Sequence, residues 1–136
     1  MAIKTLPGLT PDGQVYFDKE MQFTEAFVSP GPWKTAHGPG LLETPSGTIL
    51  CCWFAGTYEG DTDVNIVVSR LEKGADAWSS PELISTDNEF SSQNPSLFLN
   101  PNGEIWCLYT SQRGREPGKD NMQYTSVVKK QVSTDD

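Results

Sequence analysis

Short apolar runs separated by turn-forming residues make up most of the chain, and no stretch shows a convincing helical period. In two runs, Ile49–Phe54 and Ile105–Tyr109, almost every residue is apolar. A strand with apolar side chains on both faces is buried on both faces, as in a sheet packed between two neighbouring sheets. The pattern therefore predicts an all-β protein whose central strands are sandwiched between sheets.

Both runs belong to an internal repeat, because the thirteen residues 39–51 return 56 positions later as residues 95–107. A period near 50 residues is typical of β-propeller blades rather than of helical solenoids. The repeat therefore predicts a series of similar β-units. The identical positions are Pro39/Pro95, Leu41/Leu97, Pro45/Pro101, Gly47/Gly103, Ile49/Ile105 and Cys51/Cys107.

Turn residues divide each unit into short antiparallel strands, as expected of a four-stranded propeller blade. The predicted organisation is an N-terminal arm with one or two strands at 1–32, a first blade at 33–86 and a second blade at 87–136. In the first blade we predict strands at 38–44, 48–56, 64–71 and near 80–85. In the second blade we predict strands at 95–99, 104–111 and 122–132, without a fourth strand.

Composition changes this picture little. A charged fraction of 21% and a hydrophobic fraction of 36% are ordinary for a globular domain. The net charge of −8 argues against nucleic acid and anionic membranes as partners. No apolar run approaches the roughly 18 residues of a membrane helix and no signal peptide is visible, so the compartment is left open. Cys51, Cys52 and Cys107 lie in apolar strands without metal-ligand spacing, which predicts buried free thiols.

Three stretches carry a family resemblance and together cover about two-thirds of the chain. They are residues 37–47 leading into 52–60, residues 63–70 running to 77–81, and residues 94–98 followed by 102–106. These stretches resemble the sialidase-like propellers built from BNR or Asp-box repeats, a family that includes predicted neuraminidases. The resemblance implies antiparallel four-stranded blades that close a ring of six or seven.

The Asp-box of this family, Ser-x-Asp-x-Gly-x-Thr-Trp, is a turn between the third and fourth strands of a blade. The first unit keeps Ser69, Gly74 and Trp78 at longer spacing, and the second ends at Ser133-Thr-Asp-Asp136, the first half of the box. A full ring of such blades needs roughly 300 residues. We therefore expect a fragment, truncated inside an Asp-box, whose partners are the remaining blades of the same protein or another chain.

The propeller interpretation also predicts where a site would lie. In an antiparallel blade, the start of the first strand and the loop after the second strand share one end, and the first strand lies next to the axis. His37, Gln93 and Asn94 therefore share an end with the loops Tyr58–Asp63 and Arg113–Asn121. Candidate chemistry is sought at this end.

His37 is the only histidine of the chain, and its near-neutral pKa suits a general acid or base. Glu59, Asp61 and Asp63 are crowded carboxylates, and crowding can raise a pKa enough for one of them to protonate a glycosidic oxygen. We take His37, Asp61 and Asp63 as catalytic candidates. The alternatives are a histidine bonded to backbone, a merely polar loop, and a structural calcium at Asp-Thr-Asp. No other cofactor or metal is expected.

A second group of residues is predicted to bind a glycan substrate: Tyr58, Glu59, Gln93, Asn94, Arg113 and Trp33. Arg113, with Arg115 and Lys119, makes its loop basic, and an arginine could grip a sugar carboxylate through two parallel hydrogen bonds. A solvated loop is the alternative. Trp33 is expected at the rim of a pocket, whereas Trp53, Trp78 and Trp106 are expected in the core.

The resemblance implies a carbohydrate-active propeller that cleaves a glycosidic bond of an acidic sugar, as a sialidase-like exo-glycosidase does. Such enzymes carry a first arginine in a Phe/Tyr-Arg-Ile-Pro motif, and the corresponding stretch 27–37 has none. A histidine there fits relatives that are lyases of uronic acid polysaccharides. A non-catalytic carbohydrate-binding propeller and an interaction fragment are further alternatives. The 136-residue chain by itself, without further blades, is expected to be inactive.

Overall fold

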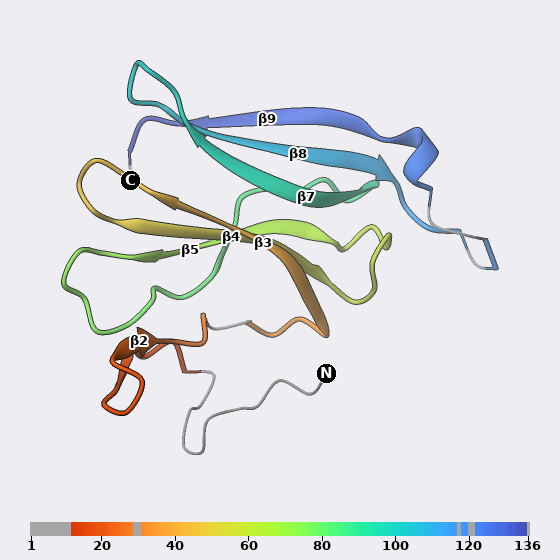
Figure 1. Ribbon diagram of the computed structural model, residues 1–136. Coiled ribbons are helices and arrows are strands. Elements are labelled where there is room, and N and C mark those ends of the chain that lie inside the picture. The colour runs from red at the N-terminus through yellow and green to blue at the C-terminus, as the bar shows by residue number, and fades with distance from the viewer. Residues whose placement is uncertain (1–11, 29–30, 117, 120–121, 136) are drawn as a thin grey trace.

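The computed structural model describes residues 12–28, 31–116, 118–119 and 122–135, and these form three antiparallel sheets (Figure 1). The first is a hairpin of β1 (Tyr16–Asp18) and β2 (Phe23–Glu25). The second has the order β3 (Thr35–Glu43), β4 (Ile49–Gly56), β5 (Asn65–Leu71) and β6 (Glu82–Leu83). The third has the order β7 (Phe90–Leu99), β8 (Ile105–Arg113) and β9 (Val127–Ser133).

The two copies of the repeat close the same turn. In each, the last residue before the turn donates a backbone hydrogen bond across it: Thr44 N donates to Thr48 O at 2.9 Å, and Asn100 N donates to Glu104 O at 2.9 Å. The glycine of each turn, Gly47 or Gly103, has a left-handed φ of 90° or 85° that favours this residue. The identical Pro-x-Gly positions therefore join equivalent strand pairs.

The innermost strands β3 and β7 share a β-bulge. Their register shifts between His37 and Gly40 and, 56 residues later, between Gln93 and Ser96. The bulge residues Gly38 and Asn94 have left-handed φ values of 67° and 52°. The sequence analysis placed the strand starts at residues 38 and 95, which was too late, because a bulge lets a strand continue through a proline.

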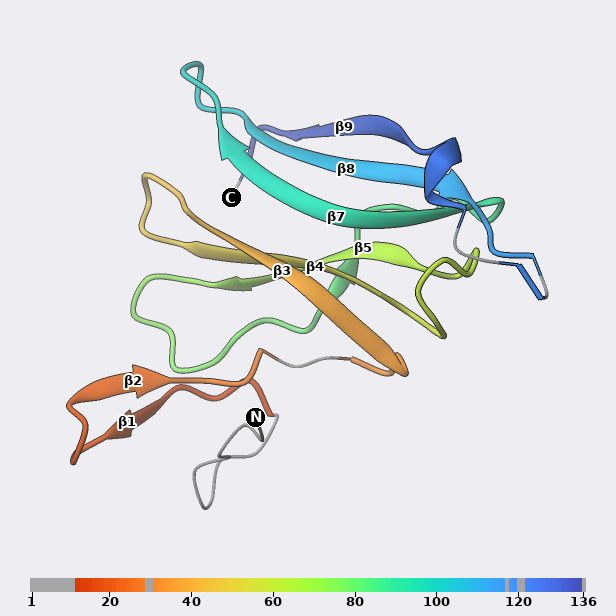
Figure 2. The ribbon, with the colours of Figure 1, turned by 45° about the vertical axis from the view of Figure 1, so that its right-hand side comes forward.

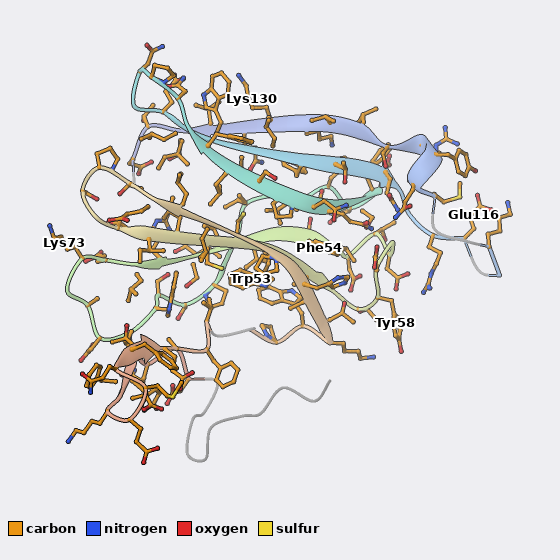
Figure 3. All side chains as sticks on the ribbon, viewed as in Figure 1. Trp53, Phe54, Tyr58, Lys73, Glu116 and Lys130 are labelled. Atoms are coloured by element: carbon orange, nitrogen blue, oxygen red, sulfur yellow. The ribbon has the colours of Figure 1, made fainter. Side chains whose placement is uncertain are left out.

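The two large sheets pack face to face, with the N-terminal hairpin beyond the first sheet (Figures 1 and 2). Side chains from both sheets form one cluster between them, and a second cluster covers the far face of the first sheet. Trp53 and Phe54, neighbours on β4, point to opposite faces (Figure 3). The first cluster is Phe54, Val64, Ile66, Cys107 and Tyr109, and the second is Cys51, Trp53, Ala55 and Val67, against which Val28, Trp33 and Trp78 pack.

Strand β4 is buried on both faces, as its uninterrupted apolar run predicts, but β8 is not. On β8, Ile105, Cys107 and Tyr109 are buried toward the first sheet, while Trp106 and Leu108 on the other face are only half-buried. The expectation of two buried faces was wrong for β8 in this chain. Among the described residues no further sheet packs on that face.

Other expectations are met in part. The three cysteines are free and buried, as predicted. The third strand of the second unit begins at Val127 rather than at residue 122, because Gln123–Thr125 forms a 3-10 turn, η1. The predicted N-terminal strands are β1 and β2, and Val15 N also donates to Asp76 O at 2.8 Å, which ties this segment to the first large sheet. Residues 1–11 of the predicted arm lie outside the described residues.

The half Asp-box that follows β9 forms a local hydrogen-bonded turn. Ser133 Oγ donates to Asp135 Oδ1 at 2.5 Å, and this bond lowers the pKa of the Asp135 carboxyl. In the first sheet Ser69 Oγ donates to Ser79 O at 2.7 Å. The serine of each box thus anchors the chain that leaves the third strand; Asp136 lies outside the described residues.

Candidate functional site

Loops of the two large sheets meet at one end of the molecule, on the right in Figure 1. The loop after β4 and the loop after β8 are joined by a hydrogen bond from Arg115 N to Gly60 O at 2.6 Å and by an ion pair between Arg115 Nη2 and Asp61 Oδ1 at 3.1 Å. A Cβ added at Gly114 would collide with Thr62. The close approach of these loops therefore requires glycine at position 114.

His37 lies on β3, directly before the bulge residue Gly38. Its ring packs against Phe54, with ring centroids 4.2 Å apart. Its Nε2 atom is 3.8 Å from Glu59 Oε2, and the two side chains are 46% and 42% exposed. The bulge and the loop after β4 thus bring an imidazole and a carboxylate together while both remain accessible to a ligand.

The other two carboxylates of that loop have different partners. Asp61 holds Arg115 of the second sheet. Asp63 accepts hydrogen bonds from Thr57 N at 3.0 Å and from Thr57 Oγ1 at 2.6 Å, so it closes the base of its own loop. With Thr62, these residues line a pocket of about 300 Å³.

Two positively charged side chains lie close to the ring of Tyr58. Lys34 Nζ lies 5.9 Å from the ring centroid, and the Arg115 guanidinium carbon lies 5.7 Å from it. Both distances are within the range in which a cation is attracted to an aromatic face. Because Tyr58 is half-exposed, these two cations border a surface that a negatively charged ligand could reach.

The remaining predicted residues are not brought to this cluster. Gln93 is fully buried, and its Nε2 donates to Ser91 Oγ at 2.9 Å. Asn94 is exposed at the second bulge, and Arg113 is exposed with its backbone N bound to Thr125 Oγ1 at 3.0 Å. Trp33 packs partly buried against the Trp53 cluster.

His37 lines a different cavity from the pocket that Asp61 and Asp63 line. His37 lines a cavity of about 290 Å³ together with Pro39 and Trp53. His37 therefore borders the largely apolar cavity, while the polar pocket of the loop is lined by other residues.

Sequence analysis missed Lys34 as a member of the cluster, and it named Arg115 as part of the basic loop but chose Arg113 as the substrate-binding residue. The basic run Arg113–Lys119 was a usable signal for Arg115. Lys34 carries no such signal, because its place beside Tyr58 depends on how the chain enters β3.

Within the described ranges, no three His, Cys, Asp or Glu side chains gather as metal ligands. The structural calcium considered for the Asp-Thr-Asp segment therefore stays a prediction. No helix among the described residues has the length and apolar character that a bilayer span requires.

Stacked antiparallel sheets with repeat-related bulges on their innermost strands and loops gathered at one end define a segment of a β-propeller. The family model of the BNR repeat-like domain matches residues 47–136, and the chain belongs to this family. This confirms the family resemblance drawn from the three motif stretches.

A solved structure named "Hadza microbial sialidase Hz136" is similar to this chain, with a TM-score of 0.64 and 15% sequence identity. The match covers 85% of this chain and 28% of the sialidase chain. It confirms the predicted all-β propeller fold. This chain spans less than a third of the length of the sialidase chain that it matches. No curated protein matches the chain.

Proposed function

We propose that this chain is part of a carbohydrate-active β-propeller that cleaves a glycosidic bond of an acidic sugar, and that His37 and Glu59 act at its substrate-binding end. Membership of the BNR repeat-like family and the fold likeness to a protein named as a sialidase support a carbohydrate substrate. The 3.8 Å approach of His37 Nε2 to Glu59 Oε2 is the observation that carries the catalytic part.

In this proposal His37 transfers a proton, and Glu59 orients the imidazole ring of His37. A carboxylate beside an imidazole favours one tautomer and stabilises the imidazolium that forms when the imidazole takes up a proton. Packing against Phe54 limits the orientations of the His37 ring, and the half-exposed side chain is accessible to a ligand. The same group can protonate a glycosidic oxygen or abstract a proton next to a sugar carboxylate.

The acidic character of the sugar is inferred from the cations beside Tyr58. Lys34 and Arg115 supply positive charge on a chain whose net charge is −8. Asp61 enters the proposal through Arg115, which it orients, and Asp63 through the loop that it closes. Gln93, Asn94, Arg113 and Trp33 stay predictions as substrate contacts.

The open face of the second sheet supports further blades as partners. Half-exposed apolar side chains, among them Phe98 and Val132, lie on strands of this sheet, and Val128 is 73% exposed. An uncovered apolar sheet face with a free edge strand favours association. We propose that another blade, from the same polypeptide or another chain, covers this face.

The test compares His37→Gln and Glu59→Gln with the unaltered protein carrying its remaining blades, on a terminal sialoside and on a uronic acid polysaccharide. We expect His37→Gln to lose about 10²–10⁴-fold in cleavage rate, the usual contribution of a general acid or base. Glu59→Gln should also lose activity, but less, because Glu59 orients the imidazole and does not itself transfer the proton. Glu43→Gln is the matched control, since Glu43 is an exposed carboxylate at the far end of β3.

Products separate the alternatives. A hydrolase releases a sugar without a new double bond, whereas a lyase leaves an unsaturated uronate that absorbs in the ultraviolet. Binding of either glycan without cleavage, unchanged in His37→Gln, would instead identify a non-catalytic binding module. Full cleavage by both variants would contradict the assignment of His37 and Glu59.

A further inference from the structure

The turn between β7 and β8 carries an asparagine followed by a glycine, Asn102-Gly103. Of the six asparagines in the chain, this is the one that precedes a glycine. An asparagine loses its amide when the backbone nitrogen of the next residue attacks the side-chain amide carbon. Glycine hinders this attack least, because it has no side chain. The sequence therefore places such chemistry first at Asn102.

The surroundings of the Asn102 side chain leave it able to react. Asn102 is exposed, and a Cβ added at Gly103 would meet no heavy atom within 4 Å. The backbone N of Asn102 donates to Asn100 Oδ1 at 2.8 Å, but its carboxamide makes no hydrogen bond to any of the residues that the structure describes. Neither packing nor a hydrogen bond therefore holds the amide carbon away from the Gly103 nitrogen.

Asn100, two residues earlier in the same turn, shows the opposite arrangement. Its Nδ2 donates to Glu104 Oε2 at 2.6 Å, and its Oδ1 accepts from Glu104 N at 3.1 Å. The residue that follows is Pro101, whose backbone nitrogen has no hydrogen to lose. Asn100 is therefore an unreactive control within the same peptide.

The equivalent turn of the first unit lacks the reactive side chain. Ser46-Gly47 stands in the place of Asn102-Gly103, 56 positions earlier, and both glycines have a left-handed φ. The two turns thus share a backbone conformation and differ in chemistry. A reaction at Asn102 would change the second unit alone.

One hydrogen bond opposes the reaction in the folded turn. Gly103 N donates to Asn100 O at 3.0 Å, so the attacking nitrogen must leave this bond before it can lose its proton. The turn lies exposed at the end of a hairpin, and such segments open locally at a low free-energy cost. We therefore expect the reaction to occur in the folded protein, but more slowly than in the unfolded chain.

We propose that Asn102 is a site of spontaneous deamidation with water as the co-reactant. The Gly103 nitrogen loses its proton and bonds to Cγ of Asn102, the bond from Cγ to Nδ2 breaks, and Nδ2 takes up a proton and leaves as ammonia. Water then opens the succinimide ring that has formed. Cleavage between Cγ and the Gly103 nitrogen gives aspartate, and cleavage between the main-chain carbonyl carbon and that nitrogen gives isoaspartate. One water is consumed, one ammonia is released, and nothing is oxidised or reduced.

Both products add a negative charge close to Glu104, and isoaspartate also adds one carbon to the backbone of the turn. Asn100 N donates to Glu104 O at 2.9 Å across the turn, and the longer backbone no longer matches this spacing. Glu104 Oε2 also accepts a hydrogen bond from Trp106 Nε1 at 3.0 Å, which connects the turn to β8. Isoaspartate should therefore loosen this end of the hairpin.

The experiment stores the purified protein at physiological temperature and neutral pH and samples it over several weeks. Trypsin then releases peptide 74–113, which contains the turn. We expect a growing fraction in which the amide of Asn102 has become a carboxyl group, located by fragmentation, and isoaspartate recognised by enzymatic methylation. The rate should rise with pH, because the attacking nitrogen must lose a proton. The midpoint of thermal unfolding should fall as isoaspartate accumulates.

Two variants separate the added carbon from the added charge. Asn102→Ser copies Ser46 of the first unit and is the matched control, so its mass at this turn and its unfolding midpoint should not change with time. Asn102→Asp carries the charge without the extra backbone carbon, so a fresh sample should unfold at the midpoint of the unaltered protein.

A sample kept unfolded in guanidinium chloride shows that the chemistry and its detection work. An Asn102 that stays intact in the folded protein while it reacts in the unfolded sample would overturn the proposal. Earlier loss of the amide at Asn88 or Asn100 would also overturn it. An unchanged midpoint after isoaspartate has accumulated would contradict the predicted loosening of the hairpin.

Discussion

The third strands of the two large sheets, β5 and β9, hold equivalent places but have opposite environments. Trp53 on β4 is opposite Val67, and the repeat-related Tyr109 on β8 is opposite Lys129. Strand β5 lies between β4 and β6 and is largely buried, whereas β9 is an edge strand with mostly exposed side chains. The two units thus keep the same strand order, while their third strands differ in sequence because one is paired on both sides and the other is exposed at an edge.

The innermost strands show the reverse case, in which the backbone is kept and the side chain changes. Both carry a bulge with a left-handed residue, Gly38 or Asn94, at positions 56 apart. The residue before it is a half-exposed histidine in β3 and a fully buried glutamine in β7. A shared backbone device can therefore present a reactive group in one unit and a packed one in the next.

Truncation of equivalent apolar residues on the third strands should give the largest difference. Ile66 and Val128 are opposite the repeat-related Phe54 and Thr110. Ile66 is fully buried, so Ile66→Ala should lower the free energy of unfolding by about 3 kcal/mol. Val128→Ala should change it by less than about 0.5 kcal/mol, because the side chain is exposed. Urea denaturation of both variants measures this.

A large cost for Val128→Ala in this chain would mean that β9 is covered in solution, for instance by self-association. In that case the cost should fall as the protein is diluted.

Replacing the left-handed residue of each bulge should change the free energy of unfolding by an intermediate amount. In Gly38→Ala the new Cβ would lie 2.7 Å from Phe54 Cε1 at a φ of 67°, so we expect a loss of about 1–3 kcal/mol of unfolding free energy. Asn94→Gly relieves a left-handed asparagine but frees the unfolded chain, so the net change should stay within about 0.5 kcal/mol. Equal losses for both variants would show that the bulges are not equivalent backbone devices.

The smallest effect is expected for an ion pair found in the second sheet. Lys129 Nζ donates to Asp87 Oδ2 at 2.8 Å, and this bond lowers the pKa of the Asp87 carboxyl. A lowered folded-state pKa contributes stability above the ordinary carboxyl pKa of about 3.9. That contribution is lost as the pH falls through the folded value.

Lys129→Met should therefore be less stable than the unaltered protein near neutral pH, and the two should converge on acidification. Lys130→Met is the matched control, because Lys130 Nζ lies 3.9 Å from the Trp106 ring centroid rather than beside a carboxylate. Its stability difference should stay constant over the same pH range. Unfolding curves at stepped pH values measure both, and a pH-independent difference for Lys129→Met would contradict the ion pair.

Much of the fold was predictable from local pattern. The run Ile49–Phe54, the Pro-x-Gly turns and the 56-residue period identified the strand pairs of both units, and the three motif stretches identified the family. The starts of β3 and β7 were not predicted, because Pro39 and Pro95 look like strand boundaries when the bulges before them are unknown. The apolar run of β8 by itself did not indicate its open face, since such a run does not reveal which neighbours are present.

The candidate site was predicted less completely. The antiparallel pattern placed His37 and the loop after β4 at one end, and His37 Nε2 lies 3.8 Å from Oε2 of Glu59 in that loop. The pairing of Asp61 with Arg115, the closure of the loop by Asp63 and the burial of Gln93 depend on contacts between segments far apart in sequence. Residue type and spacing do not encode these contacts.

The amino-acid order alone determined the β-strands, the repeat that relates the two units, and which residues could do chemistry, because these follow from side-chain polarity, period and turn propensity within short segments. The fold of the first sheet decided which carboxylate meets His37, and the packing of one sheet on the other decided which arginine joins the loops. Those outcomes depend on distances between strands that are remote in the chain, and such distances exist only once the sheets have packed.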